Sequence, residues 1–168
     1  MQRDYFLRLI EQVGEFLKRA MRQRRKNTPQ EALQSIMAAC ERLFAMDAVR
    51  LFQFLPDQHF VMLTEGEPTE IARDKVLIYA ALNLEAGQCY VALNQPVLAR
   101  QSFLNALRFT LRARQTFPAA GWPEFAPSLT ELLDLLGDAS LDPDTTALLE
   151  AATPSGAIPP ARRGQPSR

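Results

Sequence analysis

The stretch from Ala86 to Leu107, AGQCYVALNQPVLARQSFLNAL, constrains the fold of this chain more than any other part of it. Its small residues, Gly87, Ala99 and Ala106, are spaced to meet between two neighbouring helices, where Tyr90 and Phe103 fill the remaining space. Two helices can approach closely only where the side chains at their contact are small. We therefore predict a tightly packed helix–turn–helix unit, and none of these packing residues is chemically reactive.

Apolar residues recur at spacings of three and four along most of the chain, which is typical of amphipathic helices. The expected helical segments are 3–25, 29–44, 47–55, 56–63, 69–93, 96–116, 129–136 and 143–152. The segment 76–84 is apolar nearly all round, so its helix should be the most buried one. Because 47–55 and 56–63 are short packing pieces, we predict an all-α fold of about six or seven helices, arranged as antiparallel pairs in one compact right-handed bundle.

The ends of these helices carry local signals. Side chains that accept a hydrogen bond from the first helical turn favour the N-cap position, and asparagine tolerates the left-handed conformation that ends many helices. Asn94 is therefore expected to end the helix 69–93. The expected N-caps are Thr28, Thr69, Ser128 and Asp142, with Glu31 and Glu131 completing two capping boxes.

The 168 residues suit one domain, which we place at residues 1–152, followed by a flexible tail containing proline and arginine at 153–168. The formal net charge is zero, so no overall field attracts a polyanion. The charges are nevertheless uneven: residues 1–30 contain eight Lys/Arg and three acids, whereas residues 117–153 contain seven acids and no Lys or Arg. Such a chain can dock its own ends, pair with a second copy, or present two distinct patches.

The residues that metal binding, nucleophilic catalysis and phosphate binding usually need are missing from the sequence. His59 is the only histidine, and the two cysteines, Cys40 and Cys89, lie in separate apolar helical patterns. A metal site or a Cys-His nucleophile needs more such residues at closer spacing, and no glycine-rich phosphate loop is present. We expect buried reduced thiols, a structural histidine, no cofactor, no metal and no enzymatic activity. No uncharged run approaches the length of a membrane span, and charged residues interrupt any leader-like start, so we expect a cytoplasmic protein.

The central stretch also matches a repeat pattern. Ala86-Gly87-x2-Tyr90 is followed by Ala99-x3-Phe103 and Ala106, which resembles the tetratricopeptide motif. The chain departs from that motif at Asn83, Ala86 and Leu111, where the family has tryptophan, leucine and proline. A weaker copy lies 67 residues upstream, at Ala20, Ala32, Ile36 and Ala39. The resemblance implies a tetratricopeptide-like helical domain rather than a regular solenoid.

The opening QRDYFLRLIEQ, the EGEP turn and the repeat pair together resemble an uncharacterised bacterial family of small all-helical proteins. This resemblance covers residues 2–115. It implies the helical fold and supplies no activity.

The tetratricopeptide resemblance implies a function in protein–protein interaction, with a peptide or a second copy of the chain as the partner. In such folds the first helix of each pair lines the concave side. Arg24 and Arg25 would then bind an acidic group, and Gln88 a peptide backbone. The full expected lining is Leu17, Met21, Arg24, Arg25, Ala81, Leu84, Gln88 and Val91.

Two alternatives remain open. The basic cluster at the end of segment 3–25 could bind nucleic acid or an anionic lipid surface, or it could simply complement the negative end of the helix dipole. The first helix also has an apolar stripe wide enough for homodimerisation. The residues expected to bind nucleic acid or lipid are Arg19, Arg22, Arg24, Arg25 and Lys26, with Arg162 and Arg163 of the tail.

Overall fold

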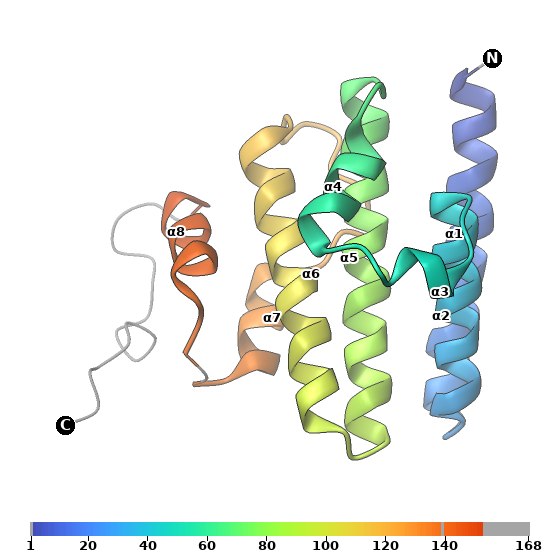
Figure 1. Ribbon diagram of the computed structural model, residues 1–168, viewed down its shortest axis with the longest axis vertical. Helices are drawn as coiled ribbons and strands as arrows, with labels where there is room; N and C mark the ends of the chain where they lie inside the picture. Colours follow the sequence, from blue (N-terminus) through green and yellow to red (C-terminus); the bar gives the residue numbers. More distant parts are fainter. Residues whose placement is uncertain (1, 139, 153–168) are drawn as a thin grey trace.

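The computed structural model describes residues 2–138 and 140–152, and within them every regular element is a helix (Figure 1). The expected tail at 153–168 lies outside the described residues. The described part contains eight helices, more than the six or seven expected, because both short segments form separate helices; the predicted segment 47–55 is helical only over Ala48–Leu51. The helices are α1 (Gln2–Arg25), α2 (Pro29–Phe44), α3 (Ala48–Leu51), α4 (Pro56–Thr64), α5 (Thr69–Ala92), α6 (Pro96–Thr116), α7 (Leu129–Leu136) and α8 (Pro143–Ala152).

The close packing of α5 against α6 is confirmed. Ala99 and Ala106 are buried, and a Cβ atom added at Gly87 would overlap the ring of Phe103. Glycine is therefore required at position 87 because the aromatic ring occupies the space of any side chain. The two helices run antiparallel and are joined by a short turn at Asn94, which adopts the expected left-handed conformation with φ of 56°.

Helix α5 is the centre of the fold. It contributes twelve buried residues, more than any other described helix, as its apolar sequence predicts. On one side it packs with α1, α2 and α4 in a first core, which includes Val13, Ile36 and Leu77. On the other side, α6 packs with α7 and α8 in a second core, which includes Leu107 and Leu132.

Two of the four predicted caps, Ser128 and Asp142, accept a hydrogen bond from the first turn of their helix. The Asp142 carboxylate accepts a hydrogen bond from the Thr145 amide at 2.9 Å, and Ser128 accepts one from Glu131 at 3.4 Å. Thr28 occupies the N-cap position of α2 as predicted, but its hydroxyl makes no capping bond and donates instead to the Gln23 carbonyl at the end of α1. The prediction for Thr69 is wrong: Thr69 lies in the first turn of α5, and Pro68 takes the N-cap position.

The single histidine is a buried structural residue. His59 Nε2 lies 2.8 Å from the Leu51 carbonyl oxygen, and Nδ1 lies 3.0 Å from the Tyr79 hydroxyl. A carbonyl oxygen only accepts, so Nε2 carries a proton and donates to it, while Nδ1 accepts from Tyr79. These bonds join α3, α4 and α5.

Both cysteines are free and buried, as expected. Desolvation raises the pKa of the Cys40 thiol to about 12 and that of Cys89 to about 11, so neither is a thiolate at neutral pH. None of the helices in the described ranges is sufficiently long and apolar to cross a bilayer.

Candidate partner-binding surface

Helices α1 and α5 are joined by an ion pair at the position where the sequence predicts a binding surface. The Arg24 guanidinium donates from Nε to one carboxylate oxygen of Glu85 and from Nη2 to the other, at 3.4 Å. The Glu85 side chain is only 7% exposed, and the hydrogen bond to it raises the pKa of Arg24. Arg24 therefore holds α1 against α5, and its charge is already matched.

The apolar residues expected to line the surface are divided between the two cores. Leu17 is buried in the first core, and Met21 packs against that core half-buried. Leu84 is half-buried against the second core, on the side of α5 that faces α6. Ala81 is buried as well. These four side chains therefore contribute mainly to packing, and they do not form one shared lining.

The remaining predicted residues stay accessible. Arg25 and Val91 are exposed, and Gln88 is half-buried one turn beyond Glu85 on α5. Because Arg24 contacts Glu85, the end of α1 and the last turns of α5 lie beside one another at the same end of the molecule (Figure 1). The structure thus brings Arg25 and Gln88 close to the same region.

Two further sets of exposed residues lie at this end of the molecule. Arg22 and Lys26 are exposed, and among the described residues neither they nor Arg25 forms an ion pair. The first turn of α6 adds Val97 and Leu98, which are 78% and 41% exposed. We define the basic–apolar end as the following residues: Arg22, Arg25, Lys26, Gln88, Val91, Val97 and Leu98.

Local hydrogen bonds fix the turn that carries the cations. Asn27 adopts φ of 63° and reverses the chain, and the Thr28 hydroxyl donates to the Gln23 carbonyl at 2.9 Å. The Gln23 side chain in turn accepts a hydrogen bond of 2.7 Å from the Ser35 hydroxyl on α2. The cations therefore project from an anchored turn, and they also complement the negative end of the α1 dipole.

Exposed cations at the same end of the molecule as exposed aliphatic side chains suit an acidic partner that also has apolar side chains. Within residues 2–138 and 140–152, no group of three His, Cys, Asp or Glu side chains is placed to hold a metal ion. Sequence reasoning missed Val97 and Leu98 because apolar residues at helical spacing indicate a buried face, whereas these two lie in the first turn of α6 beside Pro96.

Comparisons with protein-family models, with curated proteins and with solved structures found no match for this chain. The function of the surface is therefore inferred from its own residues.

Proposed function

We propose that this chain is a non-catalytic protein–protein interaction module that binds an acidic, partly apolar peptide segment at the basic–apolar end. The pairs α1–α2 and α5–α6 support a tetratricopeptide-like arrangement, since each pair is antiparallel and α1 runs beside α5. In that arrangement α1 and α5 are the first helices of their pairs, which are the helices that carry the partner in such folds.

The observation that carries the proposal is the contrast between neighbouring cations at the end of α1. Arg24 is neutralised by Glu85, whereas Arg22, Arg25 and Lys26 are exposed and have no ion pair among the described residues. The next acid along the chain, Glu31, is exposed in the first turn of α2. Unpaired cations on a rigid element favour encounter with an acidic partner and fix its orientation.

Each kind of side chain at the basic–apolar end contacts a different part of the partner. Arg22, Arg25 and Lys26 bind carboxylates of the partner segment. Gln88 carries a donor and an acceptor, so it suits the backbone amide and carbonyl of an extended peptide. Val91, Val97 and Leu98 cover the partner's apolar side chains.

The test is a selection of random twelve-residue peptides displayed on phage, followed by binding measurements with an enriched peptide. The proposal predicts enrichment of Asp and Glu together with Leu or Phe. Binding should be lost in Arg25→Glu/Lys26→Glu and in Val97→Asp, and it should be retained in Arg3→Glu/Arg8→Glu at the opposite end of α1 and in the equally exposed control Val49→Asp. Failure to enrich acidic peptides, or binding that survives the first two variants, contradicts the proposal.

The alternative function, binding of nucleic acid or an anionic lipid surface, uses the same cations but predicts a different dependence of binding on salt. Counterion release makes that binding steeply dependent on salt. If the protein were retained on heparin or on phosphatidylserine vesicles and no peptide were enriched, the alternative of nucleic-acid or lipid binding would replace the peptide proposal. Light scattering of the unmodified protein shows whether a second copy is the partner.

A further inference from the structure

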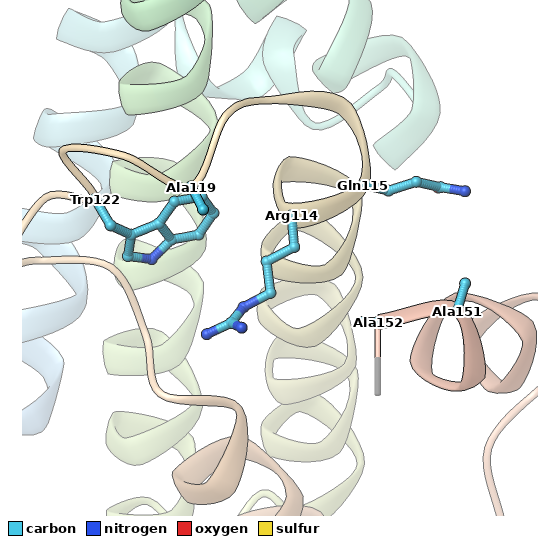
Figure 2. A pocket seen from close by; sticks show the side chains of 6 residues that line it. All are labelled: Arg114, Gln115, Ala119, Trp122, Ala151 and Ala152. Atoms are coloured by element: carbon cyan, nitrogen blue, oxygen red, sulfur yellow. The ribbon is translucent and has the colours of Figure 1, made fainter. Parts of the chain in front are cut away.

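A second candidate site lies at the other end of α6, away from the basic–apolar end. A cavity of about 510 Å³ is bounded there by the last turn of α6, the loop 117–127 and the end of α8. Figure 2 shows α6 between Trp122 of the loop and the alanines of α8, with Arg114 extending on the Trp122 side and Gln115 on the α8 side. This volume is within the range of small-molecule sites.

The loop that carries Trp122 is held in place by hydrogen bonds from α5. Arg73 of α5 is buried, and its guanidinium donates to the carbonyl oxygens of Ala120 at 2.6 Å and Gly121 at 2.9 Å. A third bond of 3.3 Å reaches the carbonyl of Pro118. Trp122 itself packs half-buried against the first core. A buried arginine that binds three carbonyls of one loop gives the indole ring a fixed position, so the site is largely formed before a ligand arrives.

The lining is apolar and positively charged. The indole ring and the methyl groups of Ala119, Ala151 and Ala152 supply the apolar surface. The Arg114 guanidinium lies 5.6 Å from the indole ring centroid, and none of the described lining residues is acidic. The Gln115 amide adds a neutral donor and acceptor. Without a carboxylate in the described lining, the arginine charge is matched only by the indole face.

We propose that this cavity binds a planar aromatic monoanion, such as an aromatic carboxylate. The aromatic ring packs on Trp122 and the alanine methyl groups, and the carboxylate accepts hydrogen bonds from the Arg114 guanidinium. A charge-assisted hydrogen bond is stronger than the exposed cation–π contact that it would accompany, so an anion is preferred over a neutral molecule of the same shape.

Because Trp122 is the only tryptophan, a single spectroscopic label reports on the site. The full chain, labelled with 5-fluorotryptophan, is titrated with 2-naphthoate and, separately, with uncharged 2-naphthamide while the ¹⁹F resonance is recorded. The proposal predicts one saturable shift with 2-naphthoate and an affinity about tenfold lower for 2-naphthamide, the factor expected from one charged hydrogen bond.

Two variants with matched controls locate the ligand. Arg114→Gln should lower the affinity for 2-naphthoate about tenfold and leave 2-naphthamide unchanged, whereas Arg19→Gln, which removes a similar cation–π contact on α1, should change neither. Ala151→Leu fills the cavity and should abolish the shift, whereas Ala147→Leu, one turn earlier on α8 and outside the lining, should not. No saturable shift, equal binding of acid and amide, or a shift that persists in Ala151→Leu would overturn the proposal.

Discussion

Arg24 at the end of α1 and Glu85 in the second half of α5, two residues 61 positions apart in the chain, form a largely buried ion pair. The cost of removing both groups from water is offset because each oxygen of the carboxylate receives a hydrogen bond. The pair also fixes where the exposed cations beside Arg24 stand relative to α5. The surface proposed for binding thus depends on a neighbouring residue that is itself structural.

Removing Arg24 should leave the Glu85 carboxylate buried without its partner. We expect Arg24→Ala to lower the free energy of unfolding by about 3 kcal/mol. In contrast, Arg25→Ala, at the exposed next position, should change it by less than about 0.5 kcal/mol. Urea denaturation followed by circular dichroism measures both. If the two variants proved equally stable, the ion pair would not hold α1 against α5.

The pair also determines how the binding surface can be tested. A variant that carries Arg24→Glu places a second carboxylate beside Glu85, so a loss of binding would report a damaged fold. Arg25→Glu/Lys26→Glu reverses two exposed charges and should leave the helical signal and the melting temperature unchanged.

Gly87→Ala tests the contact between α5 and α6. Alanine normally stabilises a helix interior by about 1 kcal/mol relative to glycine. Here its methyl group overlaps the buried Phe103 ring, so we expect a net destabilisation of about 1–2 kcal/mol. Gly14→Ala on α1 is the matched control, because nothing lies within 4 Å of its added Cβ, and it should stabilise the protein. Thermal unfolding of both variants should show shifts of opposite sign; a stabilised Gly87→Ala would refute the close packing.

Tyr79→Phe tests the buried histidine. The substitution removes the hydroxyl that donates to His59 Nδ1 and leaves a buried acceptor unsatisfied, which should cost about 1–2 kcal/mol. The exposed Tyr5→Phe is the control and should be neutral. Equal denaturation midpoints for the two variants would show that the bond does not contribute to stability.

The stability of α8 depends on pH because Asp142 caps its first turn. Hydrogen bonds from Thr145 lower the pKa of Asp142 below its ordinary value, so the folded state binds this proton less readily than the unfolded state does. The cap therefore contributes at neutral pH, and its contribution is lost as the pH falls through the lowered pKa. We expect Asp142→Ala to cost about 1 kcal/mol at pH 7 and much less at an acidic pH below that lowered pKa. Hydrogen exchange of the α8 amides at the two pH values measures this, and an equal effect at both would contradict it.

The sequence predicts the helices well because their signals are local. Pro29, Asn94, Ser128 and Asp142 mark helix ends through the conformation of a few neighbouring residues, and the small residues of α5 and α6 act within one helical hairpin. Thr28 and Thr69 show the limit of such signals. Thr28 bonds to the preceding helix, and Pro68 already serves as the cap before Thr69.

The candidate surface is less predictable because it depends on pairs distant in sequence. No local pattern indicates that Arg24 meets Glu85, or that Leu84 faces the second core. The sequence also does not reveal that Arg73 holds the loop before Trp122, since its three carbonyl partners lie at least 45 residues away. Arg25, Gln88 and Val91 keep some exposure, and their part in binding stays a prediction.

The most direct test of the interaction proposal is the dissociation constant of one selected acidic peptide, measured by fluorescence anisotropy for the unmodified chain and two charge-matched variants. We expect Arg25→Glu/Lys26→Glu to weaken binding more than tenfold, and Arg3→Glu/Arg8→Glu, at the far end of the same helix, to leave it unchanged. Equal dissociation constants for the two variants would show that the peptide does not bind at the basic–apolar end.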